Sequence, residues 1–146
     1  MAIWQYTIEL IPKETLLELG NTDSITLDDY ENFDFWKNYD YEIKFFDSLT
    51  VELKRGKSWS DEIILYGDSE STCINFFKEE GKIVGVEVRI DFRDDYSGVL
   101  NSVIEFCNLN GFVILDNLKI LDLNATFIIH HIENSEQFFT YKKLFG

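Results

Sequence analysis

The sequence is poor in proline, cysteine and glycine, and each shortage narrows the possible architectures. One proline and 8 glycines in 146 residues leave little room for a flexible linker. The two cysteines, Cys73 and Cys107, stand among apolar neighbours inside expected regular elements, which favours reduced core thiols over a disulfide framework. We therefore expect one compact domain, residues 1–146, that folds without covalent staples.

Long apolar runs are also missing. No stretch approaches the ~18 consecutive apolar residues that a membrane helix requires. Glu9 and Lys13 interrupt the apolar N-terminal part, where a secretory signal would lie. These patterns predict a soluble, cytoplasmic protein with no membrane partner. Aromatic residues, in contrast, make up 16% of the chain, which excludes a disordered polypeptide.

Basic residues are scarce. The 13 Lys and Arg residues stand against 27 Asp and Glu residues, which gives a net charge of −14. Such a surface repels nucleic acid and anionic membranes and attracts basic partners. We therefore expect no direct binding to nucleic acid. The same charge would also arise in a protein that only needs a solubilising surface.

Familiar catalytic and metal-binding motifs are absent as well. Gly56-Lys57-Ser58 ends like a phosphate-binding loop, but Val51 stands where that motif has its first glycine. His130 and His131 are adjacent in an expected helix, so they point about 100° apart and are poorly placed to grip one metal ion. The sequence predicts no catalytic residue, no metal site and no cofactor. It favours a binding protein over an enzyme but leaves both open.

Hydrophobic periodicity predicts an α+β domain, in which an antiparallel sheet of four to six strands carries helices on one face. The tail beyond Glu136 is rich in aromatic residues and is expected to pack down. Strands are expected at residues 3–10, 63–66, 72–77, 84–92, 112–115 and 118–123, and helices at residues 12–19, 41–53, 98–109 and 124–132.

The most regular stretch, residues 72–111, reads as two strands joined by a tight turn and followed by a helix. The second strand alternates strictly, so one face would lie under the helix and the other would face outward. The residues expected under the helix are Val84, Val86, Val88, Ile90 and Phe92. The outward residues are Glu87, Arg89, Asp91 and Arg93.

Acidic and basic side chains alternate on that outward face about 7 Å apart, close enough to pair with one another. A solvated ladder on an open sheet is the simpler interpretation. The alternative is a small enzyme or ligand-binding domain in which Arg89, Asp91 and Arg93 bind the ligand. That alternative requires a pocket over these side chains, whereas a flat face would argue against it.

Residues 21–41 interleave carboxylates with aromatic rings and show no helical or strand period. The carboxylates would select a basic partner and the rings would anchor it. Equally, the rings would fit under a long loop as a satellite of the core. If this segment is a recognition surface, the residues expected to contact the partner are Asp28, Asp29, Glu31, Asp34 and Trp36.

Several short sequences stand in a familiar order: Gly56-Lys57-Ser58-Trp59-Ser60, Tyr66-Gly67-Asp68, Val88-Arg89-Ile90-Asp91-Phe92-Arg93 and Phe112-Val113-Ile114-Leu115-Asp116. Over roughly the last two-thirds of the chain, this pattern resembles a group of small, acidic, uncharacterised bacterial proteins that we associate with the immunity proteins of toxin–immunity systems. The resemblance implies a non-enzymatic protein that neutralises a basic protein such as a toxin domain. It assigns no functional residue. Mimicry of nucleic acid toward a nuclease is a variant of this hypothesis, and self-association is a further alternative.

Overall fold

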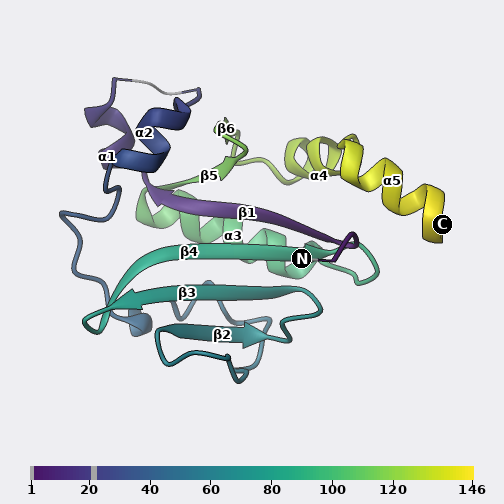
Figure 1. The fold of residues 1–146 in the computed structure, drawn as a ribbon, viewed down its shortest axis with the longest axis horizontal. Helices are drawn as coiled ribbons and strands as arrows, with labels where there is room; N and C mark the ends of the chain where they lie inside the picture. Colours follow the sequence, from purple (N-terminus) through teal and green to yellow (C-terminus); the bar gives the residue numbers. More distant parts are fainter. Residues whose placement is uncertain (1, 21–22) are drawn as a thin grey trace.

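Six strands form one antiparallel sheet in the computed structural model, which describes residues 2–20 and 23–146. The N-terminal strand, β1 (Gln5–Pro12), runs through the middle of the sheet, between β4 (Lys82–Asp91) and β5 (Phe112–Asp116) (Figure 1). The fold is therefore α+β, as the periodicity predicts. In spatial order the strands are β2 (Ile63–Gly67), β3 (Cys73–Glu79), β4 (Lys82–Asp91), β1 (Gln5–Pro12), β5 (Phe112–Asp116) and β6 (Lys119–Leu121).

The inner face of the sheet carries the core. Ile8 lies opposite Val88 across β1 and β4, and Val88 lies opposite Ile74 across β4 and β3. All three are at most 1% exposed, and burying each such side chain contributes about 1.5–3 kcal/mol. Helix α3 (Ser97–Asn110) packs its apolar stripe on this face, as expected, and ends at Gly111 in a left-handed conformation. The buried thiols of Cys73 and Cys107 are free, as the sequence predicts.

Two C-terminal helices follow the last strand, and the first of them places Ile128 and Ile132 in the core. Asn124 caps α4 (Ala125–Glu133) by accepting from the backbone N–H of Phe127 at 2.9 Å, as expected for an N-cap. The tail then forms α5 (Glu136–Phe145), a helix that the sequence reading did not predict. The ring of Phe138 packs against Phe92, with ring centroids 5.0 Å apart, so the tail does pack down.

The helix predicted at residues 41–53 is wrong. Only a short 3-10 turn, Ile43–Phe46, forms there, and successive tight turns carry the chain to Leu53. Phe46 and Leu49 are buried as a helix would bury them, since turns three residues long reproduce the same spacing. Thr50 and Val51 are β-branched and disfavour a helix, and the Thr50 hydroxyl donates to the carbonyl oxygen of Asp47.

The expectation for Val84 is also wrong. The register between β3 and β4 shifts after Phe77, which lies opposite Gly85 while Lys78 lies opposite Ile83. Val84 is the extra residue of this β-bulge, and a bulge reverses the facing of the residues beyond it. Ile83 is therefore in the core at 1% exposure, whereas Val84 faces outward at 38%.

Both edges of the sheet are covered. Asp23–Ile25 bonds to β6, and Lys54–Gly56 bonds to β2, which protects the edges from pairing with another chain. A side chain at Gly56 would meet the carbonyl oxygen of Gly67 at 2.4 Å, so the segment that covers β2 requires glycine at this position. The two helices near the N-terminus are α1 (Lys13–Glu18), which confirms the expected helix there, and α2 (Leu27–Asn32), which was not predicted.

Within residues 2–20 and 23–146, no helix has the length and apolar character needed to cross a membrane.

Candidate functional site

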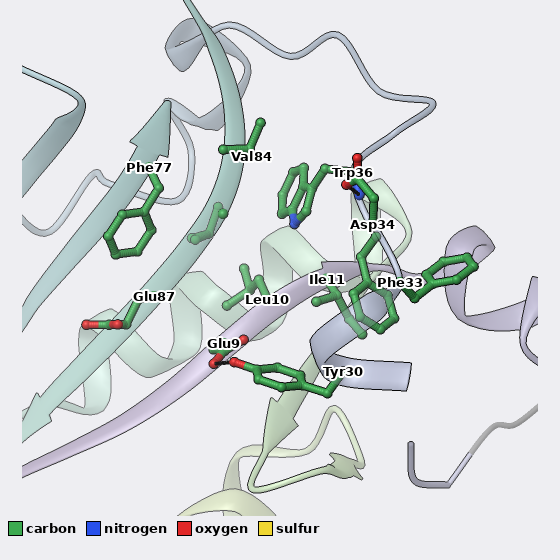
Figure 2. A pocket seen from close by; sticks show the side chains of 13 residues that line it. Glu9, Leu10, Ile11, Tyr30, Phe33, Asp34, Trp36, Phe77, Val84 and Glu87 are labelled. Carbon is green, nitrogen blue, oxygen red and sulfur yellow. Dashed lines mark hydrogen bonds between the residues drawn. The ribbon is translucent and has the colours of Figure 1, made fainter. Parts of the chain in front are cut away.

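An acidic cleft opens on the outer face, the side of the sheet opposite α3. Pairing between β1 and β4 ends at Leu10 and Val86, and the two strands separate beyond that point. The fork holds a cavity of about 410 Å³, closed on its far side by residues 30–36 (Figure 2). We call this cavity the acidic cleft. It is lined by Glu9, Leu10, Ile11, Tyr30, Phe33, Asp34, Phe35, Trp36, Phe77, Val84, Gly85, Val86 and Glu87.

Two glutamates of the same charge face each other on the strands that form the fork. Glu9 on β1 and Glu87 on β4 are directly opposed in the strand register. Like charges in that position destabilise a sheet, so each requires a compensating partner. Tyr30 donates a hydrogen bond to Glu9 at 2.5 Å, and Arg89 pairs with Glu87 at 2.7 Å. Glu9 has no cationic partner among the described residues.

Because no cation neutralises Glu9, its surroundings favour the protonated carboxyl group. Burial raises the pKa of Glu9, and the nearby charge of Glu87 raises it further, while the hydrogen bond from Tyr30 lowers it. Burial, together with the hydrogen bond and charge of Glu9, raises the pKa of Tyr30 to about 12, so Tyr30 remains a donor at neutral pH. A cation that enters the cleft would therefore replace the missing positive charge at Glu9.

Helix α2 presents Tyr30 to the sheet and its carboxylates to solvent. The hydroxyl of Thr26 caps the helix by accepting from the backbone N–H of Asp29 at 3.0 Å. Asp28 and Glu31 are exposed and Asp29 is half-buried. No lysine or arginine of the described chain pairs with any of the three. These predicted contact residues thus form an uncompensated acidic rim beside the cleft.

The other two predicted contact residues line the cleft itself. Asp34 is exposed and accepts from the backbone N–H of Trp36 at 3.0 Å. The Trp36 ring is 7% exposed and packs against Phe112 at a centroid distance of 5.7 Å, so this ring belongs to the core. Its indole nitrogen nevertheless points into the fork (Figure 2), and within the described chain the indole N–H has no hydrogen-bond acceptor. The cleft therefore offers an indole N–H that has no acceptor within the described chain, beside carboxylates.

The alternative set, Arg89, Asp91 and Arg93, does not converge on one site. Arg89 lies on the outer face beside Glu87. Asp91 is 0% exposed, and its carboxylate accepts from the Arg93 guanidinium at 2.7 Å from Nη2 and at 3.0 and 3.2 Å from Nε. That guanidinium also lies over the Trp4 ring, 4.2 Å from its centroid. Asp91 and Arg93 therefore form a closed structural pair at the end of β4.

Sequence reasoning missed Glu9 and the role of Tyr30. Glu9 alternates correctly for the outer face, but a single sequence does not show that β1 pairs with β4. Tyr30 stood out only as one ring among many in residues 21–41. Comparison with protein-family models, with curated proteins and with solved structures finds no match to this chain.

Proposed function

We propose that the protein binds and neutralises a basic protein partner, in the manner of an immunity or inhibitor protein. The observation that carries this proposal is the opposed pair Glu9 and Glu87 inside a concave cleft that lacks a cation at Glu9. A lysine or arginine of the partner would supply that cation. The acidic rim of α2 lies beside the cleft and would contact basic residues around it.

The size of the cleft indicates what enters it. At about 410 Å³ it lies near the lower end of the range for small-ligand pockets, ~300–1,000 Å³. It therefore suits one or two side chains of a partner. A stable protein interface buries about 800 Å² on each side, so the rest of the contact must come from the rim.

The partner would also provide a hydrogen-bond acceptor for the indole N–H of Trp36. A carbonyl oxygen of the entering segment would accept from the unused N–H, while its basic side chain would reach Glu9. Hydrogen bonds to charged groups contribute about 1.5–3 kcal/mol each, more than neutral ones. The net charge of −14 would attract the same partner from a distance and speed association.

A small cationic ligand is the second candidate, and the concavity of the outer face favours it. The cleft contains a carboxyl group of raised pKa beside a second carboxylate, an arrangement that also serves acid–base chemistry. The two candidates differ in what they require of α2. A protein partner needs the acidic rim, whereas a small ligand needs only the cleft.

The test takes the proteins encoded by the genes next to this one and measures their binding by calorimetry at ~50 and ~300 mM salt. We expect the affinity to fall at least tenfold with salt and again in the Glu9→Gln, Glu87→Gln double variant. The matched control is Glu105→Gln with Glu136→Gln, which removes the same charge from exposed positions of α3 and α5. Equal loss in both double variants, or binding indifferent to salt, would contradict the proposal.

A second set of variants separates the two candidates. Neutralising Asp28, Asp29 and Glu31 together should weaken a protein partner at least tenfold, because those carboxylates form the rim. The same triple variant should bind N-acetyl-arginine amide as the wild type does, since this probe reaches only the cleft. If the protein partner binds the triple variant as tightly as it binds the wild type, the rim has no role in recognition.

A further inference from the structure

Trp59 is the most exposed large apolar side chain in the described chain, at 89%. Tryptophan is enriched among the residues that dominate protein interfaces, and a ring so exposed has no role in the core. Trp59 contacts no other aromatic ring of the described residues. It stands on the loop before β2, on the same outer face as the acidic cleft.

The loop holds Trp59 in place. The hydroxyl of Ser58 lies 2.5 Å from the carbonyl oxygens of both Ser60 and Ile63 and is shared between them. The backbone N–H of Glu62 donates to the hydroxyl of Ser60 at 3.2 Å. Trp59 is thus presented on a hydrogen-bonded turn, which reduces the entropy lost when a partner covers it.

Beside Trp59 is a cavity of about 390 Å³, which we call the Trp59 hollow. Its floor is the outer face of β2 and β3, where Ile63 lies opposite Phe77 and Leu65 lies opposite Asn75. The hollow is lined by Lys57, Ser58, Trp59, Ile63, Leu65, Ser69, Asn75, Phe77 and Arg89.

The lining of the Trp59 hollow selects an apolar occupant. Arg89 is already neutralised by Glu87 at 2.7 Å, and Lys57 is exposed at the rim. The large side chains that remain are Trp59, Phe77, Ile63 and Leu65. An anion would therefore find little uncompensated charge in the hollow, whereas a large apolar side chain would bury Trp59 and remove its own surface from water.

The Trp59 hollow borders the acidic cleft, because Phe77 lines both. Glu9 on β1 and Asn75 on β3 are separated by β4, so the two sites lie two strand spacings, about 10 Å, apart. The outer face thus carries an acidic site and an apolar site within reach of one short peptide segment.

We propose that the Trp59 hollow receives a large apolar side chain of the same basic partner, two or three residues from the basic side chain that enters the acidic cleft. This inference rests on the proposed function and specifies the partner further. The partner carries a basic and an apolar side chain about 10 Å apart on one protruding segment. Neither site alone defines the partner.

The test uses three peptides, acetyl-Arg-Gly-Phe-amide, acetyl-Arg-Gly-Ala-amide and acetyl-Gln-Gly-Phe-amide, titrated by NMR against the whole protein. We expect phenylalanine to tighten binding at least fivefold over alanine, with shifts at Trp59 and Phe77. Trp59→Ala should abolish that gain and leave the arginine dependence intact. Phe139→Ala, at a ring 57% exposed on α5, is the matched control and should change nothing.

The outcomes separate the two proposals. If binding requires arginine but is equal for phenylalanine and alanine, the Trp59 hollow is not part of the site and the proposed function stands. If arginine and glutamine bind equally, the proposed function fails. If the phenylalanine gain survives Trp59→Ala, the apolar side chain lies elsewhere and the inference is overturned.

Discussion

Tyr30 donates a hydrogen bond of 2.5 Å to Glu9 across the mouth of the acidic cleft, joining α2 to the centre of the sheet. This bond is the only compensation that Glu9 receives from a neighbour in the described chain, because Glu87 opposes it with a like charge. The protonation of Glu9 in the cleft therefore depends on two neighbours, Glu87 and Tyr30.

Removing either neighbour should shift the pKa of Glu9 in opposite directions. Tyr30→Phe removes the hydrogen bond that lowers this pKa, so the pKa should rise. Glu87→Gln removes a charge that raises it, so the pKa should fall. Carbon-13 NMR titration of the Glu9 carboxyl measures both shifts. Shifts of the same sign in the two variants would show that the opposed pair does not control Glu9.

Glu9 should also make the stability depend on pH. Its pKa in the folded protein is raised above the ordinary value of 4.5, so the folded state holds the proton more tightly than the unfolded state. The resulting stabilisation is fully present below pH 4.5 and is lost as the pH rises through the raised pKa. In Glu9→Gln this loss should disappear. Urea unfolding from pH 4 to 8 measures the free energy of unfolding of the variant and the wild type. An identical dependence of this free energy on pH in the two proteins would contradict the prediction.

The bulge in β4 buries Ile83 and leaves its neighbour Val84 partly exposed. Ile83→Asn should lower the free energy of unfolding by about 3 kcal/mol or more, since Ile83 is 1% exposed and the amide would be buried. Val84→Asn should cost less than about 1 kcal/mol, because Val84 faces the cleft. Urea denaturation compares the two. The reverse order would restore the strict alternation that the sequence suggests.

The sequence predicts the strands well because alternation and turn residues are local signals. The β3–β4 hairpin is the clearest case: Glu80 and Gly81 both have positive φ, and the expected turn contains that glycine. The bulge at Val84 escapes the same reading, since strict alternation hides one inserted residue. The false helix at residues 41–53 has a similar origin, because apolar spacings of three and four also suit a series of tight turns.

The candidate site was only partly predictable. Asp28 and Glu31 could be chosen as candidates because they are acidic residues in a segment without helical or strand periodicity. The structure places them on an exposed rim. Trp36 was expected either to contact a partner or to pack under the loop as part of a satellite core. Its ring is in the core, and its indole nitrogen points into the fork (Figure 2). Glu9 becomes significant only through its pairing with Glu87, and the adjacency of β1 and β4 is a property of topology that a single sequence does not show.

A second polar cluster holds α4 against the sheet. One carboxylate oxygen of Asp116, at the end of β5, accepts from the hydroxyl of Tyr6 and lies 2.7 Å from Nε2 of His131. Burial raises the pKa of Tyr6, and the bond to Asp116 and its charge raise it further. Asp116→Ala should therefore lower the pKa of Tyr6, which absorbance titration of the tyrosines would detect.

The same substitution should lower the free energy of unfolding by about 1–3 kcal/mol, because the half-buried Tyr6 hydroxyl and His131 lose their common acceptor. A double-mutant cycle with Tyr6→Phe isolates the shared part. Since both single changes break the same bond, the double variant should be less destabilised than the sum of the two by about 1 kcal/mol. Strict additivity in urea denaturation would mean that Tyr6 and Asp116 stabilise the fold independently and that Asp116 acts chiefly through His131.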